Sequence, residues 1–124
     1  MEKDKKALHL VLKRKWWDMI ASGEKREEYR EVCHYWATRL LNEQYRWYSM
    51  NTDYPKDFCG WIREHLYEIS DIQFRTFEKV CFHLGYTNTT MTFRIVKISQ
   101  GYGVPEWGGS SERVFIISLG ERIE

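Results

Sequence analysis

The fold and the candidate site both depend on residues 23–30, which read GEKREEYR. Six of these eight residues are charged, and the other two are glycine and tyrosine. The stretch follows an apolar strand and an amphipathic helix, where a small domain normally places a core strand. Strand alternation puts Arg26, Glu28 and Arg30 on one face, yet the opposite face is polar as well. Water can solvate one polar face, whereas the other needs an ion-pair network or a polar ligand. We therefore expect the functional site here.

The flanking sequence predicts an α+β fold. Residues 8–12 (LHLVL) read as a strand whose nearly continuous apolar run indicates a central position in the sheet. Apolar residues over 16–21 recur at helical spacing, and Ser22-Gly23 predicts the end of that helix. Further helices are expected over about residues 33–44 and 61–69, and further strands over 25–31, 77–84, 90–99 and 114–119. This order indicates a small, mostly antiparallel β-sheet or barrel with helices inserted early.

The length indicates one domain. A chain of 124 residues and 15.1 kDa can bury one modest core and not two. We predict a single domain over residues 1–124, in which residues 43–76 form a variable insertion or lid. Aromatic residues reach 16%, which indicates either an aromatic core or exposed stacking surfaces.

Composition predicts a cytoplasmic protein without membrane contact. No apolar run approaches the roughly 20 residues of a membrane span, and the first six residues are mostly charged. The three cysteines, Cys33, Cys59 and Cys81, are an odd number without C-x-x-C spacing, which indicates reduced thiols. The four histidines show no ligand spacing, so neither a metal nor another cofactor is expected.

Charge is distributed unevenly along the chain. The net charge of +1 excludes a strongly basic protein. Residues 1–15 carry six lysines and arginines against two acids, whereas residues 53–78 carry three against six. Such polarity suits a module that orients on a polyanion, so any nucleic-acid contact should be local.

Several stretches resemble the ASCH domains. The family pattern G-x-K-x-x-E-x-R falls on Gly23, Lys25, Glu28 and Arg30. Other similar stretches are LHLVLK (8–13), WWDMI (16–20), VCFHLGY (80–86), PEWG (105–108) and FIISLG (115–120). Together they span most of the chain except about residues 43–76. The resemblance implies a PUA-like β-barrel with a cleft where the motif's lysine, glutamate and arginine meet, and a role in recognising RNA or nucleotides.

Some small bacterial relatives in this family resemble acetylcytidine amidohydrolases. In those proteins a lysine at the position of Lys25 works with a threonine at the position of Glu28 and with a glutamate from a later strand. Here Glu28 replaces the threonine, so the nucleophile is missing. Glu78 is the obvious acid on a later strand.

The charged motif itself suits an anion-binding corner. Lys25, Arg26 and Arg30 can hold a phosphate or a base edge, because arginine offers a bidentate fork. Glu28 would orient the arginine or accept hydrogen bonds from a base. In the alternative interpretation, Glu28 and Arg30 simply pair with each other. As a catalytic base, Lys25 would need the lowered pKa that burial beside the two arginines provides.

Residues outside the motif could complete the site. Lys13 and Lys15 lie at the start of the first helix, where a bound phosphate would offset their unfavourable position on the helix dipole; we expect Arg14 between them to be solvated. Tyr86 and Trp107 lie in glycine-containing loops and could stack on bases. Trp107 could equally plug one end of the barrel.

Three functions are consistent with these observations. The first is an RNA- or nucleotide-binding module whose ligand enters the cleft lined by lysine, glutamate and arginine. The second is a small metal-independent hydrolase, an amidohydrolase or a ribonuclease, in which Lys25 and Glu28 do the chemistry. A protein-interaction module using the aromatic stretch 45–61 is the third. Whether the protein is an enzyme stays open at this point.

Overall fold

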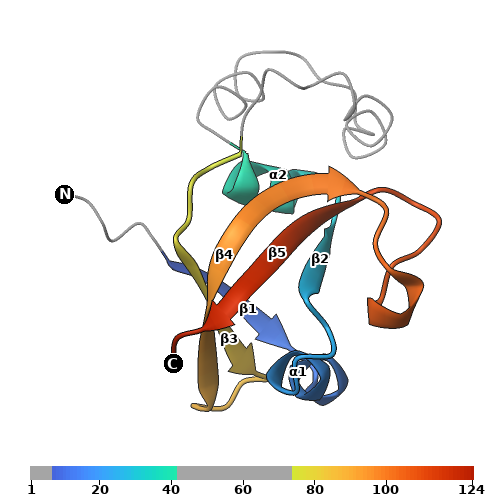
Figure 1. The fold of residues 1–124 in the computed structure, drawn as a ribbon. Coiled ribbons are helices and arrows are strands. Elements are labelled where there is room, and N and C mark those ends of the chain that lie inside the picture. The colour runs from blue at the N-terminus through green and yellow to red at the C-terminus, as the bar shows by residue number, and fades with distance from the viewer. Residues whose placement is uncertain (1–6, 42–73) are drawn as a thin grey trace.

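The computed structural model describes residues 7–41 and 74–124 (Figure 1). The elements, in chain order, are β1 (Ala7–Leu12), α1 (Arg14–Ala21), β2 (Glu27–Glu31), α2 (His34–Leu40), β3 (Lys79–Leu84), β4 (Thr90–Gly101), the 3-10 helix η3 (Pro105–Trp107) and β5 (Val114–Arg122). The predicted α+β class with a small, mostly antiparallel sheet is confirmed.

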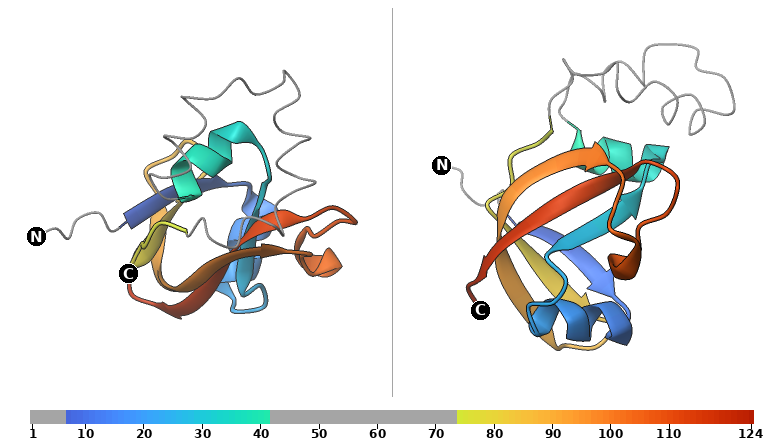
Figure 2. Two further views of the ribbon diagram at one scale, coloured as in Figure 1. Left: turned by 90° about the horizontal axis from the view of Figure 1, so that it is seen from above. Right: turned by 45° about the vertical axis from the view of Figure 1, so that its right-hand side comes forward.

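The five strands form one curled half-barrel sheet in the order β1-β3-β4-β5-β2. Only β1 and β3 run parallel, and the other neighbours are antiparallel. The pairing of β4 with β5 shifts register twice, on either side of Ile95, and such irregularities increase the local bend of the strands. The two helices lie at opposite ends of the curled sheet (Figures 1 and 2).

The predicted central position of the first strand is wrong, because β1 is an edge strand. Its burial alternates: Leu8, Leu10 and Leu12 are buried, whereas His9 and Val11 face outward. The apolar run looked continuous because Val11 is apolar although 45% exposed. Among the described strands, β1 and β2 are therefore the two edge strands of the half-barrel.

The first helix ends as predicted. Gly23 adopts a positive φ of 87°, and its N–H donates to the Ile20 carbonyl. Ile20 and Trp17 form the buried face of α1. Beyond the turn, the Lys25 N–H donates to the Met19 carbonyl at 2.9 Å. This bond folds residue 25 back against α1, before β2 begins.

The core fills the concave side of the sheet. Its fully buried large side chains come from both helices, from four strands and from Leu41 just after α2: Phe82, Phe115, Leu10, Ile20, Leu40, Leu41, Met91 and Ile117. The last two strands extend past their predicted ends. The segment that we predicted as an insertion lies mostly outside the described residues, yet its end belongs to the frame: Phe74 packs edge-on against Phe115, and the Arg75 N–H donates to the Leu40 carbonyl.

α2 is shorter than the predicted helix, since Leu41 leaves the helix and bridges to Phe74. Residues 42–44 and the predicted helix over 61–69 lie outside the described residues. Within the described part of the chain, no helix has the length and apolar character needed to cross a membrane.

Candidate functional site

A cleft opens between the two edge strands, β1 and β2. Its volume is about 620 Å³, and its walls come from β1, the start of α1, β2, α2, the turn after β3, and η3. Six of the sixteen lining residues are aromatic: Trp16, Tyr29, Tyr35, Trp36, Tyr86 and Trp107. The cleft is thus an aromatic pocket with a charged floor.

Lys25 is the most enclosed charge in the cleft, with its side chain 1% exposed. Its ammonium donates to the Trp107 carbonyl at 2.6 Å and lies 3.2 Å from Glu28 Oε1. The same nitrogen lies 4.8 Å from the centre of the Trp16 ring and 4.6 Å from that of Tyr29. Lys25 therefore joins the polar strand to the loop that carries η3.

Arg30 crosses from one edge strand to the other. Its Nη1 donates to Glu28 Oε2 and to the Tyr29 carbonyl, the latter at 2.8 Å. Its Nη2 donates to the Val11 carbonyl in β1 at 3.1 Å. The guanidinium also lies 5.2 Å from the centre of the Trp36 ring. A guanidinium carries further N–H donors beyond these three bonds, from which a ligand could accept.

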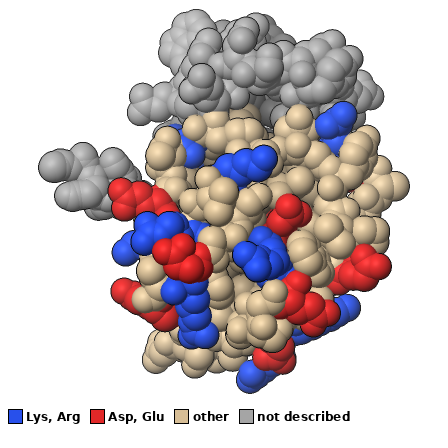
Figure 3. Space-filling view, viewed as in Figure 1, with Lys and Arg blue, Asp and Glu red and all other residues tan. Residues whose placement is uncertain are grey.

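Lys25, Glu28 and Arg30 form what we call the buried triad. The pairing of Glu28 with Arg30 that the sequence left as an alternative is present, and Lys25 is added to it. With two cations around one carboxylate, the charged triad has an excess of positive charge that would attract an anion. Basic and acidic side chains are interspersed on the molecular face shown in Figure 3, so an anion would find no broad basic surface on that face.

Burial lowers the pKa of Lys25, and this effect outweighs the opposing influence of Glu28. Arg30 contributes a smaller lowering of the same pKa. Arg26, which we expected to contribute, has no part in the shift. Lys25 consequently loses its proton more readily than an ordinary lysine does.

Tyr29 ties the η3 loop to β2. Its hydroxyl donates to Glu27 Oε1 at 2.7 Å and accepts from the Val104 N–H at 2.8 Å. Burial and the Glu27 bond raise the pKa of Tyr29 to about 12. Gly103 fits against this ring because a Cβ atom there would lie only 2.6 Å from it. These contacts set the position of Trp107 in the cleft wall.

The elevated pKa gives a stability prediction. The folded protein keeps the Tyr29 proton up to about pH 12, whereas the unfolded chain loses it near 10. The stabilisation is therefore complete below pH 10 and is lost as the pH rises toward 12. Denaturant titrations should show the advantage of wild type over Tyr29→Phe shrinking from about pH 9 to about pH 11. A constant difference would contradict this assignment.

Six of the eight predicted ligand-binding residues line the cleft: Lys13, Lys25, Glu28, Arg30, Tyr86 and Trp107. Lys15 and Arg26 do not. The Lys15 ammonium lies over the Trp16 ring, 4.6 Å from its centre. Arg26 is exposed, because Lys25 enters the cleft from the turn and the next residue points away. Arg14, predicted as solvated, is exposed and pairs with Asp18.

Other cleft residues were not predicted from the sequence. Trp16 and Trp36 pack against the core, and they also line the cleft. Helical spacing does not show whether such a residue faces the core or the cleft, because a residue at the border of the apolar face contacts both. Tyr29 and Tyr35 were missed as well. The aromatic stretch 45–61 lies outside the described residues.

We compared the chain with protein-family models, curated proteins and solved structures, and none of them matches. The function must therefore be inferred from the cleft itself.

Proposed function

We propose that this protein is an RNA- or nucleotide-binding module of the PUA-like ASCH type. The observation that carries this proposal is the buried triad at the floor of an aromatic cleft. An ion-pair network with a purely structural role could lie anywhere in the interior. This one lies at the cleft between β1 and β2, where the Arg30 side chain is 15% exposed and can meet a ligand.

The cleft suits a nucleobase with an attached phosphate. Its volume falls within the roughly 300–1,000 Å³ of small-molecule sites. Aromatic walls can stack on a base, and the carboxylate of Glu28 accepts hydrogen bonds from amino groups. Lys13, at the exposed entrance, can contact a phosphate. The base and the phosphate of a nucleotide thus each have a counterpart in the cleft.

The experiment is an anisotropy titration of short labelled RNAs, followed by competition with single nucleotides at several salt concentrations. We expect saturable binding that weakens as salt rises, because phosphate contacts release counterions. Competition by single nucleotides would indicate a nucleotide site, and competition only by longer RNA would indicate an RNA site. Salt-independent binding, or none, would contradict the proposal.

Tyr86 offers a prediction for stacking. This residue is 98% exposed on the turn after β3, where it lines the cleft. Replacing it with alanine should weaken binding by about 1–3 kcal/mol, which is the usual cost of a lost base stack. Tyr86→Phe should bind like wild type, and Tyr102→Ala, at another exposed tyrosine outside the cleft lining, is the control. Equal effects of the two alanine variants would argue against stacking at Tyr86.

A hydrolase is the second candidate, favoured by one observation. The pKa of Lys25 is lowered, and the Glu28 carboxylate lies 3.2 Å from its ammonium. Such a pair has the hydrogen-bond geometry for proton transfer, and the lowered pKa makes Lys25 a better base candidate than an ordinary lysine. Among the described residues, the cleft lining has no serine, threonine or cysteine, so Lys25 itself would be the base or nucleophile.

Product masses distinguish the two candidates. Incubation with cellular RNA and modified nucleosides, followed by mass spectrometry, would show a new mass only for an enzyme. The enzyme should have a bell-shaped pH profile and lose its rate in Glu28→Gln while keeping its ligand, at a temperature where that variant is folded. New masses that persist in Lys25→Ala would exclude this site as the catalyst.

A further inference from the structure

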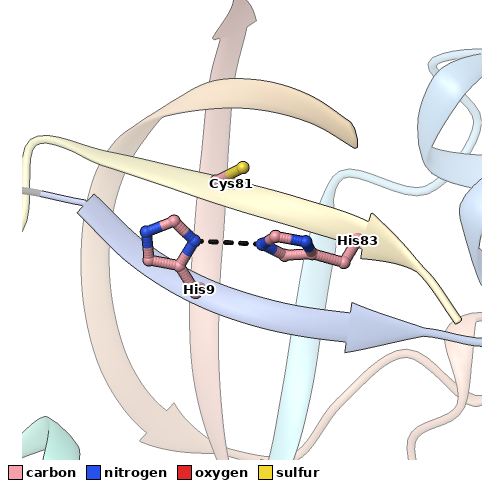
Figure 4. A group of neighbouring side chains, drawn as sticks. All are labelled: His9, Cys81 and His83. Atoms are coloured by element: carbon pink, nitrogen blue, oxygen red, sulfur yellow. Dashed lines mark hydrogen bonds between the residues drawn. The ribbon is translucent and has the colours of Figure 1, made fainter. Parts of the chain in front are cut away.

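Three side chains that can bind a metal meet on the outer surface of the sheet. His9 comes from β1, and Cys81 and His83 come from β3 (Figure 4). β1 and β3 are parallel neighbours, with His9 opposite Cys81 and Val11 opposite His83. Because strand positions alternate between faces, these three side chains share the face opposite the buried Leu10.

The three ligand atoms lie close together. His9 Nδ1 and His83 Nε2 are 3.0 Å apart, and one nitrogen of each imidazole and the Cys81 sulfur all lie within 4.8 Å of one another. Two imidazole nitrogens on one tetrahedral zinc ion would be about 3.4 Å apart, given Zn–N bonds near 2.0–2.1 Å. Small side-chain rotations would therefore bring all three atoms to bonding distance of one ion.

We propose that His9, Cys81 and His83 bind a thiophilic divalent cation, and we assign it as Zn²⁺. Two imidazoles and one thiolate are borderline-soft ligands, which suit zinc and do not suit magnesium or calcium. Three protein ligands leave the fourth tetrahedral position to water. Cys81 and His83 are half-buried and His9 is exposed, so an ion can enter from solvent.

The site lies at the border of the candidate cleft, since His9 also belongs to the cleft lining. The metal proposal does not depend on the proposed function, because its ligands are outside the buried triad. The sequence predicted no metal, and the reason is physical. His9 and His83 are 74 positions apart, and only the parallel pairing of β1 with β3 brings them together.

A hydrogen bond between the two imidazoles could account for their proximity without an ion. Zinc titration separates these explanations. Protein freed of metal with a chelator should take up one equivalent of Zn²⁺ in competition with a chromophoric chelator. With Co²⁺ as a probe, it should show the charge-transfer absorption of a thiolate bound to cobalt. Failure of wild type to bind one equivalent, or cobalt binding without the thiolate band, would overturn the proposal.

Variants test the ligand set. Cys81→Ser should abolish the thiolate band and weaken zinc binding at least about 100-fold, since even the loss of an outer-shell partner costs 10–100-fold. His9→Gln should weaken zinc binding comparably. The matched controls are Cys33→Ser and Cys59→Ser, which should keep both signals. Zinc should also raise the melting temperature of wild type but not that of Cys81→Ser. If Cys81→Ser binds zinc like the control variants, the site is not formed by these residues.

Discussion

Glutamine in place of Glu28 is expected to lower the free energy of unfolding by about 3–5 kcal/mol, the usual cost of breaking a buried ion pair. Lys25 and Arg30 would then lie at the floor of the cleft without the carboxylate that both of them contact. The side chains of Lys25 and Glu28 are 1% and 5% exposed, so water cannot solvate the Lys25 ammonium in place of the lost carboxylate. Chemical denaturation followed by tryptophan fluorescence measures the change.

Glu24→Gln is the matched control for Glu28→Gln, because Glu24 is an exposed glutamate in the same stretch. We expect its effect to stay within about 0.5 kcal/mol. A loss below about 1 kcal/mol for Glu28→Gln would show that Glu28 is not the counter-charge of the triad.

A double-mutant cycle tests whether the effect passes through Lys25. Once Lys25→Met has removed the cation, Glu28→Gln should cost less, with a coupling energy of about 0.5–3 kcal/mol. The pH dependence of the free energy of unfolding should also show that Glu28 acts on Lys25. Glu28 raises the pKa of Lys25, so its removal lowers that pKa further. Because the unfolded chain then binds more protons than the folded one, the Glu28→Gln variant should recover stability as the pH rises toward 10.5. Purely additive effects would contradict the triad.

Alanine in place of Arg30 is expected to cost about 2–5 kcal/mol of binding free energy toward RNA or a nucleotide. The change removes the guanidinium that connects β2, Glu28 and the β1 edge. Arg30→Lys should recover part of this loss, since it keeps the charge but not the fork. Anisotropy titrations at two salt concentrations measure both the loss of affinity in Arg30→Ala and its partial recovery in Arg30→Lys.

The control for Arg30→Ala is Arg26→Ala, four residues away in the same stretch. It removes the same charge, but Arg26 is exposed and outside the cleft lining. Its effect on binding should be small. If both variants weaken binding equally, the affinity comes from general electrostatics and not from the cleft. Thermal melts confirm that each variant is folded at the assay temperature.

Local pattern was enough to predict most of the frame. The turn at Gly23 and the polar strand follow from residue chemistry within a few positions. The place of β1 at the sheet edge did not, because the exposed Val11 made the strand look buried on both faces. Burial is decided by which strands pair, and the local residue pattern of one strand does not contain that information.

The site was predictable to the extent that its residues are close in sequence. Lys25, Glu28 and Arg30 form a motif, whose polar character on both faces indicated a buried network or a ligand. The aromatic walls depend on tertiary packing: Trp16 and Trp36 lie at the border between core and cleft. The cluster of His9, Cys81 and His83 depends on strand pairing alone. The aromatic walls and this cluster could therefore be recognised only once the fold was known.

The most direct test of the binding cleft is a nucleotide and RNA titration followed through the indole N–H resonances of the six tryptophans. Trp16, Trp36 and Trp107 line the cleft, and Trp17 is buried in the core. The proposed function predicts that the three cleft indoles shift progressively with ligand, while that of Trp17 stays in place. Shifts confined to Trp47 and Trp61, or no shifts at saturating ligand, would contradict a nucleotide-binding role for this cleft.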